Sequence, residues 1–177
     1  VQVCIENLKD GDARAIYKNV TMDFFNYGRI KMFVHANSIN AQDDDLTVFM
    51  RLGTDFNENF YEVELPLKIT PGSASAARDI WPSANEFDFA LKDLYGLKAR
   101  RDREGASLDI PFPAEGPNMV GRHGLRVVGR PDLSQVQLIM IGVRNPRTND
   151  VRSYSVCIWA NELRLTDFDR TARYAFN

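Results

Sequence analysis

Two long apolar segments, residues 135–144 and 153–165, constrain the fold of this chain most. Their sequences are QVQLIMIGVR and SYSVCIWANELRL, and a turn-forming loop over residues 145–150 separates them. Side chains alternate between the two faces of a strand, and the middle of the first segment is apolar on both faces. A strand covered on both faces is normally interior to a layered structure. The pattern therefore predicts a paired hairpin at the centre of an all-β fold, a jelly-roll-like antiparallel β-sandwich.

Polar residues stand at the far end of this predicted hairpin. Folding back at the loop places Asn161 and Glu162 roughly opposite Gln135 and Gln137. We interpret these four residues as a structural polar cluster whose groups satisfy one another across the strands, with ligand binding as the alternative. The same alternation assigns Trp159 to the core, provided that no bulge interrupts the second strand near Asn161.

Length and charge indicate one soluble domain. The chain has 177 residues, 44% of them hydrophobic and 26% charged, and a formal net charge of −2. These values are typical of a single globular domain and argue against a general nucleic-acid binder, which usually has a basic footprint. The basic cluster Arg100, Arg101 and Arg103 is interleaved with Asp102 and Glu104, so we interpret it as a solvated face.

The chain begins in the middle of a strand pattern, with neither an initiator Met nor a charged leader. We therefore expect residues 1–177 to be a single module of a much longer polypeptide. No apolar run approaches the roughly 20 residues that a spanning helix needs, so we do not expect this module itself to cross a membrane.

The two cysteines, Cys4 and Cys157, lie in the first and last predicted strands. They can form a disulfide in an oxidising compartment, but strand cysteines are as often buried thiols, and the sequence leaves both possibilities open. His35 and His123 show no ligand spacing, so no zinc site is predicted. The acidic run at residues 43–45 could hold calcium, although three adjacent acids in a polar loop are more often solvated. We expect no cofactor.

Shorter strand patterns recur along the rest of the chain. In the strand predicted over 29–36, alternation places His35 on the outward face. In the strand predicted over 60–69, Pro66 favours an edge position or a bulge, because its backbone has no N–H to donate to a neighbouring strand. The predicted strands cover residues 2–8, 15–24, 29–36, 46–53, 60–69, 87–91 and 125–128. The predicted inward residues of the three central ones are Ile30, Met32, Val34, Leu46, Val48, Met50, Leu52, Tyr61, Val63, Leu65 and Leu67.

Residues 70–124 form the least regular part and contain the one short helix of the prediction. We favour a strand over 87–91 followed by a helix over 92–103; the alternative is one helix that begins at a capping box over 83–86. Residues 104–123 are rich in Gly and Pro and are predicted to form a long loop, ordered or mobile. We expect this part to carry the interaction surface, with candidate residues Trp81, Tyr95, Arg100, Arg101 and Arg103.

No catalytic motif assembles in the sequence. It has no G-x-S-x-G elbow, no H-E-x-x-H and no phosphate-binding Gly loop. The many carboxylates could supply a glycosidase pair, but any acidic domain offers such pairs by chance. We therefore predict that the chain is not an enzyme.

Several segments of the chain are distinctive: DARAIYK at 12–18, YGRIKMFVHA at 27–36, IWP at 80–82, GRPDLS at 129–134, IGVRNP at 141–146 and WANELRL at 159–165, followed by FD at 168–169. Together they resemble the SprA family, very large cell-surface proteins of gliding bacteria. The likeness spans most of the chain, and its motifs are moderately specific. It offers no catalytic signature to transfer.

The resemblance implies a parent protein that is the outer-membrane translocon of the type IX secretion system. The chain is then a non-catalytic structural or interaction module, at the cell surface or on the periplasmic face. Its expected partners are other domains of the parent protein, accessory secretion subunits or cargo proteins. The alternative is a carbohydrate-binding β-sandwich module that uses Trp81 as an exposed platform for a glycan.

Overall fold

A computed structural model describes residues 1–169, which contain two antiparallel β-sheets. The four-stranded sheet has the order β1 (Gln2–Leu8), β10 (Tyr154–Thr166), β3 (Arg29–Ser38), β6 (Phe87–Ala90). The six-stranded sheet has the order β2 (Ala13–Met22), β9 (Val136–Arg144), β4 (Thr47–Gly53), β5 (Phe60–Pro66), β8 (His123–Val128), β7 (Asn118–Val120).

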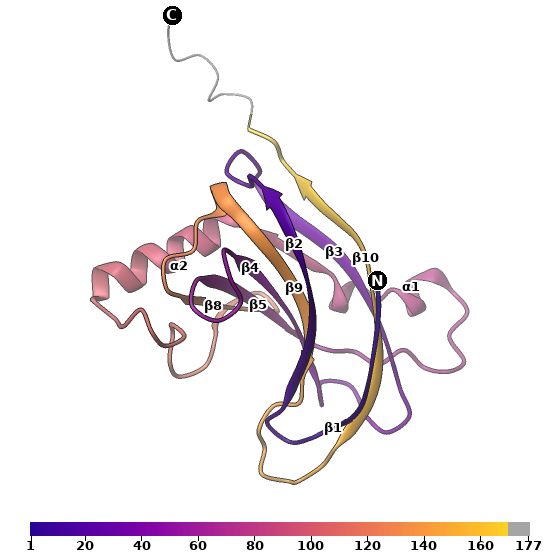
Figure 1. Cartoon of the computed structure of the whole chain (residues 1–177). Helices are drawn as coiled ribbons and strands as arrows, with labels where there is room; N and C mark the ends of the chain where they lie inside the picture. Colours follow the sequence, from indigo (N-terminus) through magenta and orange to yellow (C-terminus); the bar gives the residue numbers. More distant parts are fainter. Residues whose placement is uncertain (170–177) are drawn as a thin grey trace, which may run out of the picture.

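The chain crosses repeatedly between the two sheets, which confirms the predicted antiparallel β-sandwich. β1, β3, β6 and β10 belong to one sheet, and the strands between them in sequence belong to the other. In Figure 1, β2 and β9 run alongside β3 and β10 as a separate layer, and within residues 1–169 β2 pairs with no strand of the four-stranded sheet, so the sandwich is not closed along this side. No helix within residues 1–169 is both long and apolar enough to cross a membrane.

The predicted hairpin between the two long apolar strands is wrong. β9 pairs with β2 and β4, whereas β10 pairs with β1 and β3 in the other sheet. The connecting segment crosses from one sheet to the other. There the side-chain amide of Asn145 donates to the carbonyls of Leu8 and Arg152, at 3.1 and 3.0 Å. Both strands are interior, as the apolar pattern indicated, but each lies between two partners distant in sequence.

The core lies between the sheets, and its composition confirms the alternation pattern. All eleven predicted inward residues of β3, β4, β5 and their immediate flanks are buried in one apolar cluster. Pro66 is the last residue of β5, beyond the residues of β5 that pair with β8. The prediction of an edge strand is therefore wrong for β5 as a whole, since β5 lies between β4 and β8.

A bulge interrupts β10 at the position on which the face assignment depended. The register with β3 shifts between Asn161 and Arg164, and Glu162 has a φ of 55°. The extra residue reverses the facing of the strand beyond it. Leu165 therefore pairs with Ile30 and packs against the core, instead of sharing the outer face with Trp159.

The irregular region contains the helix in the place that we favoured. β6 ends at Ala90 and α2 (Leu91–Glu104) follows directly, burying Leu94 and Leu97. A second helix, α1 (Ala77–Ile80), is a single turn, so the prediction of one short helix was incomplete. Two 3₁₀ turns, η1 (Ser83–Asn85) and η2 (Leu133–Gln135), precede β6 and β9. The predicted long loop contains β7 and is tied to β8 by a bridge between Phe112 and Val127.

A disulfide joins Cys4 of β1 to Cys157 of β10. The two residues are direct cross-strand partners, with their Cα atoms 4.0 Å apart. Cys4 is exposed, which rules out the alternative of two buried thiols. The bond fastens the edge strand β1 to the rest of the four-stranded sheet.

Reducing this disulfide is expected to lower the free energy of unfolding by about 2–4 kcal/mol, because a cross-link across a long sequence separation restricts the unfolded chain. Here the separation is 153 residues. Urea denaturation with and without a phosphine reductant measures the difference. A Cys4→Ser, Cys157→Ser double variant is the control and should show no response to the reductant. Equal stability of the oxidised and reduced chains would contradict the prediction.

Candidate functional site

Charged side chains form a row across the outer face of the six-stranded sheet. Arg51 of β4, Glu62 of β5 and Arg126 of β8 occupy consecutive cross-strand positions. Their sequence neighbours Met50 and Val63 face the core, so alternation turns the charged groups outward. Register between neighbouring strands thus brings together residues up to 75 positions apart.

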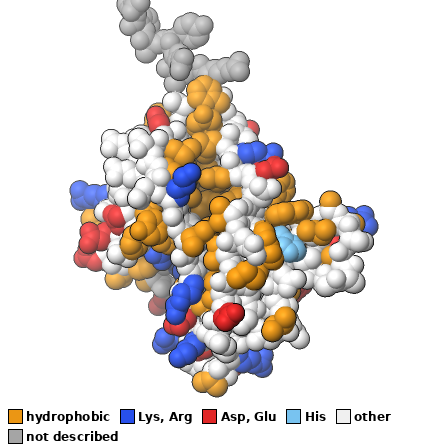
Figure 2. Space-filling view, turned by 45° about the vertical axis from the view of Figure 1, so that its right-hand side comes forward, with side chains coloured by type: hydrophobic (Ala, Val, Ile, Leu, Met, Phe, Trp, Pro, Cys, Tyr) orange, Lys and Arg blue, Asp and Glu red, His pale blue; other side chains and the backbone are white. Residues whose placement is uncertain are grey.

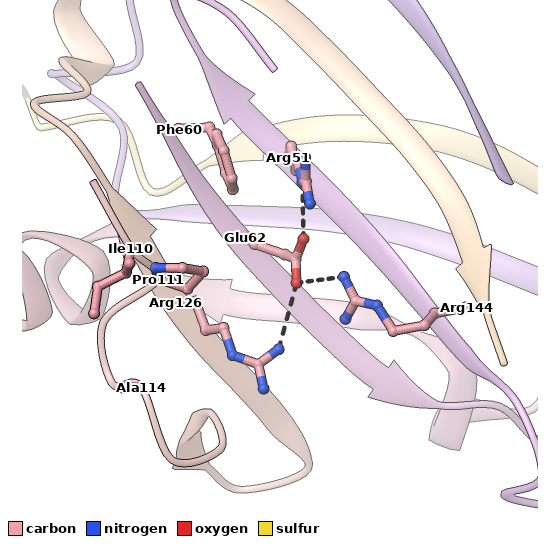
Figure 3. Close-up of a pocket in the computed structure, with 8 residues that line it drawn as sticks. All are labelled: Arg51, Phe60, Glu62, Ile110, Pro111, Ala114, Arg126 and Arg144. Atoms are coloured by element: carbon pink, nitrogen blue, oxygen red, sulfur yellow. Dashed lines mark hydrogen bonds and ion pairs between the residues drawn. The ribbon is translucent and has the colours of Figure 1, made fainter. Parts of the chain in front are cut away.

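The arginines of three strands converge on one carboxylate, as Figure 3 shows. Glu62 accepts from Arg51 Nε at 2.8 Å and from Arg144 Nη2 at 2.9 Å, and Arg126 Nη1 lies 3.6 Å from it. A second carboxylate, Glu64, accepts from Arg144 Nη1 at 2.6 Å and from Arg126 Nη1 at 3.0 Å. We call these five residues the arginine–glutamate cluster.

The central carboxylate is almost removed from solvent. The side chain of Glu62 is 3% exposed, while the three arginines keep 22–23% of their side-chain surface. Burial raises the pKa of Glu62, but the charges and hydrogen bonds of Arg144 and Arg51 outweigh this effect and hold the pKa below its usual value. Glu62 is therefore ionised at neutral pH and fixes the guanidinium groups in place.

Aromatic rings support two of the guanidinium groups. The Arg51 guanidinium lies 4.1 Å from the ring centre of Phe60, and that of Arg144 lies 4.9 Å from the ring centre of Phe49. The Phe49 ring lies over Gly142 of β9, where an added Cβ atom would stand 2.7 Å from its Cζ atom. Such cation–π contacts are strongest where the cation is partly desolvated.

A hollow of about 290 Å³ adjoins the cluster between the sheet and the loop that precedes β7. The loop contributes Ile110, Pro111 and Ala114 to its wall. The sheet contributes the guanidinium groups and the ring of Phe60. The hollow is thus charged on one side and apolar on the other.

A larger apolar groove, of about 620 Å³, lies on the open side of the sandwich. We call it the open-side groove. It extends between the edge strand β2 and the bulged part of β10, and Met32 and Met50 lie among its deepest lining residues. Its other lining residues are Val1, Ile16, Tyr17, Lys18, Val20, Met22, Ile139, Ile141, Ala160, Asn161, Glu162 and Leu163.

An aromatic group lies on the outer face of the four-stranded sheet. The ring of His35 lies 4.8 Å from that of Trp159 and 5.8 Å from that of Trp81, measured between centroids. His35 Nδ1 donates to the Ile80 carbonyl at 2.7 Å, because a carbonyl can only accept. The core assignment of Trp159 is wrong: this ring is half-buried outside the sandwich. His35 does point outward, as predicted, but beneath these rings.

The predicted basic surface is divided among different environments. Arg101 is fully buried and its Nη1 donates to the Gly129 carbonyl, so a solvated face is the wrong interpretation for this residue. Arg100 donates to the Asn118 side chain at 2.9 Å, and Arg103 is exposed. Tyr95 is half-buried, and its hydroxyl has no hydrogen-bond partner among residues 1–169. A shared interaction surface of these residues with Trp81 remains a prediction.

The predicted polar cluster does not assemble across a hairpin. Gln135 ends η2 and Gln137 lies in β9, whereas Asn161 and Glu162 lie in β10 of the other sheet. All four side chains are exposed. Because β9 and β10 do not pair, the side chains of these four residues cannot hydrogen-bond to one another across a hairpin. Asn161 and Glu162 instead occupy the bulge at the rim of the open-side groove.

Sequence reasoning missed the arginine–glutamate cluster. Alternation correctly turned Glu62 and Glu64 away from the core, and it also turns Arg51 outward. The missing information was the order of strands, which places β4 and β8 on either side of β5. In residues 1–169, no group of three or more His, Cys, Asp or Glu side chains has the arrangement of a metal site.

The fold and its surface define a β-sandwich module with an apolar groove on its open side and a charged hollow on an outer sheet face. The family model SprA_N, described as motility related/secretion protein, matches residues 1–177. The chain belongs to this family, as the sequence resemblance indicated. A search of curated proteins gave no match.

Replacing Glu62 with Gln is expected to destabilise the fold by about 3 kcal/mol at pH 7, because the clustered guanidinium groups lose their central counter-charge. The pKa of Glu62 in the folded chain lies below its usual 4.5, so its ionised form stabilises the fold above that pH. This contribution is lost as the pH falls through the folded-state pKa.

Urea denaturation from pH 7 down to pH 3 measures the effect. The stability difference between the wild type and Glu62→Gln should shrink once the pH falls below the usual glutamate value. Glu115→Gln, at an exposed loop position, is the matched control and should change stability little. A difference that stayed constant over this range would show that the charge of Glu62 is not responsible.

Proposed function

We propose that this chain is a non-catalytic structural and interaction module of a large outer-membrane machine for protein translocation and gliding motility. It sits at the cell surface or on the periplasmic face of the outer membrane and contacts other domains of its parent protein, accessory secretion subunits or cargo proteins. Membership of the motility related/secretion family supports the setting. The open-side groove is the observation that supports a binding role.

The open-side groove has the chemistry of a protein-binding surface. Most of its lining side chains are apolar, and Lys18 and Glu162 are its charged members. Figure 2 shows a band of hydrophobic side chains along the middle of this face of the molecule. Contiguous exposed apolar surface of this kind usually marks a contact with another protein segment.

The groove is bordered by an edge strand with a free side. β2 pairs with β9 and is the terminal strand of its sheet. Its side chains are exposed at nine of ten positions, including Ile16 at 39% and Tyr17 at 55%. An uncovered edge presents backbone donors and acceptors to which an extended segment of a partner can add. Such a segment would also bury the apolar side chains of the groove.

Both cysteines, both histidines and the buried Glu62 are engaged in structural contacts, which supports a non-catalytic role. Cys4 and Cys157 form a disulfide, and Glu62 is held by arginines. His35 donates to a backbone carbonyl beneath two tryptophans. The His123 Nε2 accepts from the Asp88 backbone N–H at 3.1 Å. These contacts give each of these side chains a structural role that requires no catalysed reaction.

Ile16→Lys on β2 is expected to reduce secretion of cargo by the intact parent protein, because a charge at the mouth of the groove disfavours an apolar partner. The change should leave the fold intact, since Ile16 is partly exposed. Cargo in the culture medium, normalised to the surface level of the parent protein, provides the measurement.

Met119→Lys is the matched control for this substitution. Met119 is an exposed apolar residue on β7, the opposite edge strand of the same sheet. Equal secretion by the Ile16→Lys and Met119→Lys variants would show that secretion does not depend on binding at the open-side groove. Normal secretion and surface assembly after deletion of the whole module would overturn the proposed function itself.

The aromatic group supports a second candidate function, a carbohydrate-binding module. Trp81 and Trp159 flank His35 on the outer face of a sheet, and Trp81 also contacts Phe33 at 6.5 Å between centroids. Half-buried rings held in this way present a fixed apolar surface against which a sugar ring can pack.

This second candidate predicts that a polysaccharide retards the domain in affinity electrophoresis and that Trp81→Ala abolishes the retardation, because the stacking surface is lost. Phe25→Ala removes a ring that is 64% exposed elsewhere and should have no effect. Unchanged mobility of the wild type across a broad panel of glycans would rule out the carbohydrate-binding role.

A further inference from the structure

The arginine–glutamate cluster carries one positive charge in excess. Three guanidinium groups face two carboxylates, and the five ion pairs that join them have N–O distances of 2.6–3.6 Å. A structural ion-pair network tends toward neutrality where it is poorly hydrated, because an unmatched charge is costly to desolvate. Here the excess charge lies beside a hollow, where an external anion can reach it.

Guanidinium hydrogens remain available on the side of the hollow. Arg126 uses Nη1 for Glu64, and within residues 1–169 no hydrogen bond involves its Nε or Nη2. Arg51 uses Nε for Glu62 and Nη1 for the Phe56 carbonyl, which leaves Nη2. Both side chains line the hollow. The planar fork of a guanidinium group matches two oxygens of a planar anion.

The arginines are also held in position before any ligand arrives. Glu62 fixes Arg51 and Arg144, and the ring of Phe60 packs against the Arg51 guanidinium. A binding site arranged in advance loses less conformational freedom when it binds. The cluster therefore has the donors, the net charge and the rigidity that anion recognition requires.

The charge and the walls of the hollow distinguish between classes of anion. A carboxylate carries one negative charge and neutralises the excess, whereas a phosphate monoester carries nearly two and would leave an unmatched negative charge. The opposite wall consists of the loop residues Ile110, Pro111 and Ala114. This apolar wall suits the carbon stem that carries a carboxylate.

We propose that the hollow beside Arg51 and Arg126 is a binding site for a carboxylate on a short apolar stem, supplied by a polypeptide chain end or by an acidic side chain. This site lies on the outer face of the six-stranded sheet, whereas the open-side groove lies at its β2 edge. The inference is independent of the proposed function, since it is tested by ligand binding and not by secretion.

The test is an NMR titration of the ¹⁵N-labelled chain at constant ionic strength. Acetyl-leucine represents a chain end, acetyl-glutamate α-amide represents an acidic side chain, and acetyl-leucinamide is the uncharged control. A saturable shift of the Arg126 Nε–Hε signal and of nearby amides is expected with one or both carboxylates and not with the control. The probe that binds more tightly identifies the source of the carboxylate, a chain end or an acidic side chain.

Arg126→Gln is expected to weaken carboxylate binding about tenfold or more, because a charged hydrogen-bonding group is lost. Arg126→Lys keeps the charge but loses the planar fork and should give an intermediate affinity. Thermal melting of both variants verifies that they fold. Arg122→Gln, which removes a half-exposed arginine of the β7–β8 turn outside the hollow, should bind like the wild type.

Three results would overturn the inference. The first is the absence of a saturable shift with either carboxylate at concentrations where the control leaves the spectrum unchanged. The second is an equal loss of affinity in Arg122→Gln and folded Arg126→Gln. The third is an equal response to inorganic phosphate, which would show a general anion site without selectivity for carboxylates.

Discussion

Burial of apolar side chains between the two sheets is the interaction on which the rest of this structure depends. Alternation along β3, β4, β5 and β9 directs one set of residues into a single core, and burial of such surface is the main favourable term in folding. Once these inner faces are fixed, every second residue of the same strands must point outward. The chemistry of the outer faces is therefore a geometric consequence of the core.

On the outer face of the six-stranded sheet, this consequence is an ion-pair cluster. Glu62 is buried as deeply as many core residues, although it faces away from the core. Its ionised state is compatible with this burial because Arg51 and Arg144 surround it. On the open side, by contrast, apolar residues of β2 and β9 have no covering strand. The molecule thus combines a charged hollow with an apolar groove, at separate places on one sheet.

Local pattern predicted most of the strands and the start of the helix. β1 matches the expected residues 2–8, and the strand–helix junction near residue 91 was placed correctly. The prediction of strand pairing was wrong. We expected β9 and β10 to form a hairpin because they are adjacent in sequence and both apolar. The sequence also contained no sign of the bulge at Glu162. A single inserted residue does not change the local strand propensity, but it reverses which face of the sheet the following side chains point to. Trp159 and the polar residues around it were misassigned for these two reasons.

The sequence by itself determined the fold class, the inward-facing residues of the central strands and the family. These features depend on alternation and motifs, which involve only residues that are close together in the sequence. Only the tertiary structure decided that Cys4 meets Cys157, that Arg51, Glu62 and Arg126 form one row, and that β2 borders an open groove. The physical reason is that these features depend on which strands pair. Pairing is set by the packing of the whole core, and residues far apart in sequence contribute to it.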